Sequence, residues 1–105
     1  GEHTRSFCFV NDHAELAVGL CEITKNQILN IGNDDEITID FLAKTIHALV
    51  GRKFSPEYLE GRDADTIRRC PNIDLIRHYI RDHQFTDLES GLKKTIHWYD
   101  NFVNK

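Results

Sequence analysis

The chain has 105 residues, of which 40% are hydrophobic and 29% are charged, and its formal net charge is -4. This length supports one modest core but not a dinucleotide-binding domain together with a substrate site, so we expect a single domain over residues 1–105. The acidic balance argues against general nucleic-acid binding, which needs a basic face, and no segment approaches the roughly 18 continuous apolar residues of a membrane span.

The N-terminus and the cysteines indicate the compartment. The first residues lack the basic region and apolar stretch of a signal peptide, and we interpret Gly1 as a cut end of a longer protein. The cysteines are odd in number and far apart, with no C-x-x-C pair: Cys8, Cys21 and Cys70. We therefore expect reduced thiols, no disulfide and a cytoplasmic protein.

The first half of the chain predicts strand, helix, strand and helix. Residues 6–10 are β-prone and end at residues 11–12, which we expect to cap a helix with apolar positions Leu16, Leu20 and Ile23. Residues 27–31 predict a second strand. Thr38 is a candidate N-cap for a helix that ends at Gly51 and has the apolar face Ile39, Leu42, Ile46, Leu49 and Val50.

The next segment predicts an edge strand and a long loop. Residues 53–59 are β-prone, and Pro56 favours a place at a sheet edge. Residues 60–71 are polar and Arg-rich with no sustained period, and loops on a rigid scaffold often carry binding residues. Asn72 then predicts the cap of a short helix over residues 73–80.

A longer helix closes the chain. Thr86 and Glu89 predict its capping box, and its expected buried face is Leu88, Leu92, Ile96 and Tyr99, flanked by Trp98 and Phe102. This face could bind a partner, but a chain this short is expected to need it for the core. The order β-α-β-α-β-loop-α-α predicts an α/β fold, a small mixed lobe of short strands and about four helices.

The charged residues suggest a local anion site on an acidic protein. Acidic residues crowd residues 33–36, while Arg62, Arg68 and Arg69 fall within eight positions. The alternative is that these arginines form surface ion pairs with Glu60, Asp63 or Asp65, each contributing roughly 0–1 kcal/mol.

Other chemistry is poorly supported. His78 and His83 lack the spacing of a metal-binding pair, so we expect no metal site. A nucleophile formed by Cys8 and His13 is disfavoured because Cys8 falls on an apolar strand, where a thiol is buried and inert.

Four segments, in order, resemble motifs of the extended short-chain dehydrogenase/reductases, the NAD-dependent epimerase/dehydratase family. Residues 4–12 resemble R-S-F-x-[YF]-V-x-D, and residues 29–38 resemble N-I-G-N-x-x-E-x-T. Residues 68–73 resemble R-R-x-P-D-I, and residues 88–99 resemble L-E-E-G-L-x-x-T-I-x-W-[YF]. The likeness is strongest to UDP-glucuronate decarboxylases and dTDP-glucose 4,6-dehydratases, and it implies the C-terminal substrate lobe of a Rossmann-type enzyme.

The resemblance also implies substrate-binding residues. Arg5 and Arg69 would hold the nucleoside diphosphate from opposite walls of a cleft, since guanidinium groups bind phosphate bidentately. Residues 62–65 resemble the R-x-G-D of UDP-galactose epimerases, which adds Arg62 for phosphate and Asp65 for ribose, although Ala64 replaces the glycine. The family's G-W-x-P turn is replaced by residues 81–84, so the resemblance does not predict the path of that loop.

The catalytic parts of such an enzyme are missing from this sequence. Its glycines never form a close trio that could receive the NAD pyrophosphate, and no Tyr-x-x-x-Lys pair is present. We therefore expect no catalytic or cofactor-binding residue in this chain, no activity by itself, NAD only in the parent enzyme, and a missing N-terminal NAD-binding domain. The surface that this domain would cover predicts self-association. The alternative is a stand-alone, non-catalytic ligand- or protein-binding module with the same fold.

Overall fold

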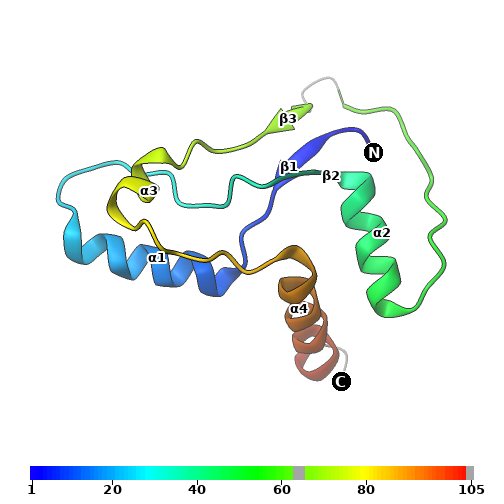
Figure 1. The fold of residues 1–105 in the computed structure, drawn as a ribbon. Coiled ribbons are helices and arrows are strands. Elements are labelled where there is room, and N and C mark those ends of the chain that lie inside the picture. Colours follow the sequence, from blue (N-terminus) through cyan, green and yellow to red (C-terminus); the bar gives the residue numbers. More distant parts are fainter. Residues whose placement is uncertain (63–65, 104–105) are drawn as a thin grey trace.

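The computed structural model describes residues 1–62 and 66–103, which form a mixed α/β lobe with three short strands and four helices (Figure 1). The elements are β1 (Thr4–Ser6), α1 (Val10–Ile23), β2 (Glu36–Thr38), α2 (Ile39–Val50), β3 (Arg68–Arg69), α3 (Asp74–Tyr79) and α4 (Leu88–Phe102). The expected fold class is confirmed. None of the described helices is both long and apolar enough to cross a membrane.

The strands form one sheet in the order β2-β1-β3. The central strand, β1, runs antiparallel to β2 and parallel to β3. Arg5 is in register with Ile37 on one side and with Arg69 on the other. Because side chains alternate between the two faces of a strand, these three residues share one face, and Thr4 and Arg68 share the opposite face.

The core lies where α1 packs against α3. Its fully buried apolar side chains are Leu16 and Leu20 from α1 with Ile73 and Ile76 from the α3 region, surrounded by Leu29, Ile31, Tyr79, Ile80 and Phe85. The lobe measures 47 × 37 × 22 Å along its principal axes. Such a thin body has little interior, so many apolar side chains remain at its surface.

The predicted helix after Thr38 is confirmed, together with both of its ends. The Thr38 hydroxyl accepts a hydrogen bond from the backbone N–H of Phe41, and Gly51 adopts a left-handed conformation with φ of 72°. Glycine reaches that conformation without a steric penalty, whereas other residues do not. Local chemistry is therefore sufficient to begin and end α2.

Two predicted strands are wrong, and the first is displaced. Residues 27–31 have no strand partner; Ile28 is 96% exposed, while Leu29 and Ile31 pack on the core from an irregular backbone. Residues 53–59 are irregular and largely exposed. The first strand ends at Ser6, because α1 already begins at Val10. Short β-prone runs become strands only where another strand's backbone is available to pair with them.

The predicted caps of the last two helices also need correction. Asn72 does accept a hydrogen bond from the backbone N–H of Asp74, but α3 begins one residue later than expected. The N-cap of α4 is Asp87, whose carboxylate accepts from the N–H of Ser90, so the capping box of Thr86 and Glu89 does not form.

The predicted buried face of α4 is confirmed only in part: its first three positions, Leu88, Leu92 and Ile96, are half-buried, but Tyr99 and the flanking aromatic residues are exposed. Trp98 and Tyr99 are each 51% exposed and Phe102 is 72% exposed. Only the first part of the helix packs closely, where Gly91 lies against Phe9. Beyond Ile96 the face is open at the surface of the thin lobe.

Candidate phosphate-binding pocket

Arg5 and Arg69 lie side by side on β1 and β3. They are register partners in the parallel pairing, so both side chains leave the same face of the sheet. Both line a pocket of about 430 Å³, together with Ser6, Cys8, Asn30, Ile31, Gly32, Asn33, Cys70 and Pro71. The two arginines therefore form one wall, instead of the opposite walls that the resemblance suggested.

Three of the four resemblance segments meet at this pocket. Its lining residues come from residues 4–12, residues 29–38 and residues 68–73, which are far apart in the sequence. Sequence reasoning did not single out Ser6 and Asn30 within these segments, although both line the pocket. The motifs were the available signal; the strand pairing decides which of their residues reach the pocket.

Local contacts orient both guanidinium groups. Nη1 of Arg5 donates to the carbonyl oxygen of Thr4 at 2.6 Å and to that of Ile67 at 3.5 Å. Nη2 of Arg69 donates to Oγ1 of Thr66 at 3.3 Å. A guanidinium has five N–H donors, and these contacts use one nitrogen of each, so donor capacity remains for a ligand.

Neighbouring carboxylates are paired with other arginines. Nε of Arg68 donates to the two carboxylate oxygens of Glu36 at 2.8 and 3.0 Å, and Arg77 binds Asp34 through two hydrogen bonds of 2.6 and 2.8 Å. These hydrogen bonds hold the pKa of Glu36 and the pKa of Asp34 below their usual values. Arg68 thus forms a surface ion pair, as the alternative interpretation expected, but with Glu36, which that interpretation did not name.

The side-by-side arrangement of Arg5 and Arg69 has an electrostatic consequence. Like charges at directly opposed positions of a sheet repel and lower the stability of the pairing. Their described side-chain contacts are with neutral oxygen atoms, of Thr4, Ile67 and Thr66, and such contacts do not cancel charge. An anion between them would remove the repulsion, and planar guanidinium forks suit phosphate in particular.

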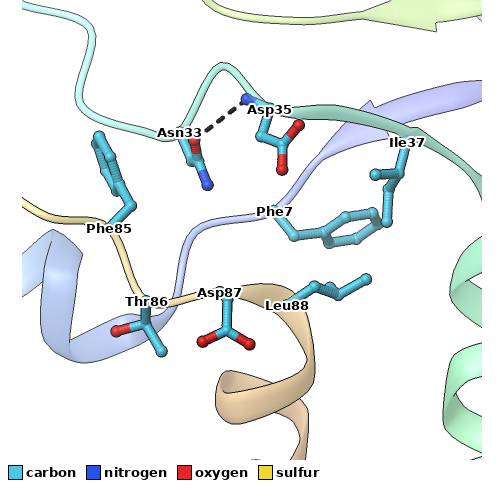
Figure 2. A pocket seen from close by; sticks show the side chains of 8 residues that line it. All are labelled: Phe7, Asn33, Asp35, Ile37, Phe85, Thr86, Asp87 and Leu88. Atoms are coloured by element: carbon cyan, nitrogen blue, oxygen red, sulfur yellow. Dashed lines mark hydrogen bonds between the residues drawn. The ribbon is translucent and has the colours of Figure 1, made fainter.

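A second pocket, of about 280 Å³, lies between the segment leading into β2 and the start of α4 (Figure 2). Its apolar part is formed by Phe7, Phe85 and Leu88, and two carboxylates, Asp35 and Asp87, stand at its edge (Figure 2). Acidic side chains repel a phosphate group. The pocket of Arg5 and Arg69 is therefore the better candidate for an anionic ligand.

The structure offers no support for the alternative chemistries. Cys8 lies half-buried in the turn after β1, and burial, followed by the nearby Asp12 carboxylate, raises the pKa of its thiol, which disfavours the reactive thiolate. Cys21 and Cys70 are also free thiols. Among residues 1–62 and 66–103 no cluster of His, Cys, Asp or Glu has an arrangement that could hold a metal ion.

Asp12 has a structural role instead of the predicted helix cap. It lies inside the first turn of α1, is 5% exposed, and accepts hydrogen bonds from the backbone N–H of Thr86 at 3.0 Å and from His83 Nε2 at 3.2 Å. It thereby ties α1 to the loop before α4, including the segment that replaces the family's G-W-x-P turn.

The two remaining candidates are less well placed. Arg62 is exposed in the irregular segment that leads toward β3. Asp65 lies outside the described residues. Their roles stay predictions from the resemblance.

Comparisons with known proteins agree with the motifs. No family model matches the chain. It is 30% identical, over 99% of its length, to the UDP-N-acetyl-alpha-D-glucosaminuronate decarboxylase of Bacillus cytotoxicus, of which it covers 35%. It is 33% identical, over 94% of its length, to UDP-glucuronic acid decarboxylase 1 of Xenopus tropicalis, of which it covers 24%.

A solved structure shows the same fold. The dTDP-glucose 4,6-dehydratase of Bacillus anthracis, crystallised in complex with NAD, matches 99% of this chain with a TM-score of 0.78 and 24% identity, and the match covers 33% of that enzyme. The chain thus spans about a quarter to a third of the relatives that it matches. The chain is thus similar in sequence to the C-terminal part of UDP-glucuronate decarboxylases, which are NAD-dependent epimerase/dehydratase family proteins, and it shares its fold with part of a dTDP-glucose 4,6-dehydratase.

Proposed function

We propose that this chain is the substrate-binding C-terminal part of an NAD-dependent nucleotide-sugar epimerase, dehydratase or decarboxylase, and that Arg5 and Arg69 bind the nucleoside diphosphate. The observation that supports this most directly is the register of the two arginines on adjacent strands, at a pocket lined by three of the four motif segments. The names of the relatives, which act on UDP- or dTDP-sugars, indicate the substrate class.

The proposed chemistry is binding and orientation. A nucleoside diphosphate carries two adjacent anionic groups, and two adjacent guanidinium groups can each donate a pair of hydrogen bonds to one of them. Arginine stays protonated throughout the physiological pH range, so binding of the diphosphate by these arginines does not depend on their titration in that range. Holding the diphosphate rigidly would in turn fix the direction in which the sugar extends.

NAD would be held elsewhere in the protein. A dinucleotide needs a glycine-rich turn between a strand and a helix, where backbone N–H groups meet the pyrophosphate. In this chain Phe9 precedes α1, Thr38 precedes α2 and Asp87 precedes α4, and the sequence has no close trio of glycines. These residues do not fit the cofactor, and we assign it to a separate N-terminal domain.

Titration calorimetry with UDP, on the protein that carries this chain, tests the proposal. Arg69→Ala should weaken binding by about 1.5–3 kcal/mol, the range for a hydrogen bond to a charged group, and Arg5→Ala should weaken it similarly. Arg69→Lys should recover only part of the loss, because an ammonium keeps the charge but not the two-pronged geometry. Uridine, which has no phosphate, should bind all four proteins equally weakly.

Two controls separate a dedicated ligand from diffuse attraction. Arg52→Ala removes one positive charge beyond the C-terminal end of α2 and should leave UDP affinity unchanged. Arg68→Ala should cost clearly less than Arg69→Ala, since Arg68 is on the opposite face of the sheet. Equal losses at Arg52 and Arg69 would indicate diffuse electrostatics, and no loss at Arg5 and Arg69 would refute the assignment.

A further inference from the structure

The position of β3 has little support from the strand itself. It consists of two residues, Arg68 and Arg69, both exposed, and it pairs with β1 at two register positions only. Ile67, just before it, is 69% exposed and adds no buried side chain. A strand this short, with no apolar side chain in the core, needs another contact to stay in register.

The carboxylate of Glu36 supplies such a contact. From β2, it accepts a hydrogen bond from the Thr4 hydroxyl on β1 and a bifurcated one, through both carboxylate oxygens, from the Nε–H of Arg68 on β3. Because β1 lies between β2 and β3, the contact with Arg68 crosses the central strand. We call this set of contacts among Glu36, Thr4 and Arg68 the Glu36 bridge; it connects all three strands through one side chain that is 24% exposed.

The Glu36 bridge lies on the face opposite to the arginine pair. Thr4 and Arg68 are register partners on one face, whereas Arg5 and Arg69 are register partners on the other. The described lining of the arginine pocket does not include Glu36. Glu36 therefore lies outside the described lining of that pocket, and its contact with Arg68 connects it to the placement of β3, where Arg69 directly follows Arg68.

We propose that Glu36 is a positioning residue, which holds β3 against β1 so that Arg69 stays beside Arg5 in a geometry that fits a diphosphate. The inference rests on the proposed function, since it assigns a residue that supports the same pocket. Because side chains alternate between the two faces of β3, Arg68 can take part in the Glu36 bridge while Arg69 faces the ligand.

The test is Glu36→Gln, which keeps the shape of the side chain but removes its charge. It should weaken UDP binding about fivefold in calorimetry, as expected when an exposed ion pair is lost. In the Arg69→Ala background the same substitution should have no further effect, because Glu36 acts through Arg69. A merely structural defect would give the same loss in both backgrounds and would overturn the proposal.

Hydrogen exchange without ligand separates this inference from the proposed function. The Thr4 N–H donates to the carbonyl oxygen of Ile67 at 2.9 Å, so its protection reports whether the β3 region stays against β1. Glu36→Gln should accelerate exchange there, whereas Glu89→Gln, which breaks the exposed pair of Glu89 with Lys93 on α4, should change neither exchange nor affinity. Unchanged exchange in Glu36→Gln would refute the positioning role. A wild-type protein that does not bind UDP would refute the proposed function instead. The exchange result would still show whether Glu36 holds β3 against β1.

Discussion

Individual residues in this lobe obtain their roles from partners that are distant in sequence. Arg68 and Arg69 are chemically identical neighbours, yet one binds Glu36 and the other lines the pocket. Strand alternation separates them, and it operates only because β3 pairs with β1. The motif was enough to select Arg5 and Arg69 as candidates, but not to show that they stand on one wall.

Asp12 likewise contributes to stability through partners that are distant in sequence. Removing its carboxylate leaves the Thr86 N–H without its acceptor in a partly buried place, and an unsatisfied donor of this kind costs about 1–3 kcal/mol. We expect Asp12→Ala to lower the free energy of unfolding by about 2 kcal/mol in urea denaturation. Asp12→Asn should cost less, since its amide oxygen can still accept from Thr86.

Asp82→Ala is the control for this prediction, because Asp82 is an exposed residue of the same loop. It should change stability little. If Asp12→Ala proved as harmless as Asp82→Ala, the hydrogen bonds of Asp12 would not hold the loop before α4.

The helices were predictable from local patterns, and α2 together with both of its ends, whereas the strands, which need a partner, were not. The hydroxyl of Thr38 and the left-handed Gly51 delimit α2 within a single stretch of chain. By contrast, residues 27–31 have the composition of a strand but lie irregularly, whereas the polar sequence of β3 forms one. Strand formation depends on pairing, which a local pattern does not contain.

The cap of α4 gives a pH-dependent prediction. Hydrogen bonds from Ser90 lower the pKa of Asp87, so folding favours its ionised form. Its contribution to stability is therefore complete above the unfolded pKa, at about 4, and is lost as the pH falls through the lower folded pKa. We expect the thermal midpoint of the wild type to exceed that of Asp87→Asn at neutral pH, and this difference to shrink below about pH 4.

Circular dichroism melts of both proteins between neutral pH and about pH 2 would measure this difference. Asparagine also caps helices but does not titrate, so the variant isolates the carboxylate. If the difference in thermal midpoint between the wild type and Asp87→Asn grew on acidification, the ionised form of Asp87 would not be the stabilising one.

At the scale of the whole molecule, apolar surface remains uncovered. A body 22 Å thick buries few side chains, and Trp98, Tyr99 and Phe102 of α4 are at least half exposed. Clustered exposed aromatic residues favour contact with another surface. We expect the 105-residue chain to self-associate, seen as a concentration-dependent sedimentation coefficient.

Replacing Trp98 and Phe102 together by Gln should weaken this association. Ile28→Gln is the control, since Ile28 is 96% exposed but is not part of α4. A monomeric profile at high concentration in the wild type would exclude association through this face.

The 105-residue chain should also show no NAD-dependent turnover of UDP-glucuronate or dTDP-glucose, because the groups that bind NAD and move protons are absent from its sequence. Mass spectrometry of the reaction mixture would detect product at low conversion. Activity that persisted through repeated purification would contradict this prediction, whereas UDP binding without turnover would agree with a substrate-binding part.

The sequence by itself determined the fold class, α2 with both of its caps, and the likeness to UDP-glucuronate decarboxylases, because these depend on local chemistry and on motifs readable in order. It also indicated Arg5 and Arg69 through those motifs. Only the tertiary structure decided the strand order, the burial of Asp12 against Thr86 and His83, and the pairing of Arg68 with Glu36. Each of these contacts joins residues more than 30 positions apart, and no local pattern specifies which distant partner a side chain will meet.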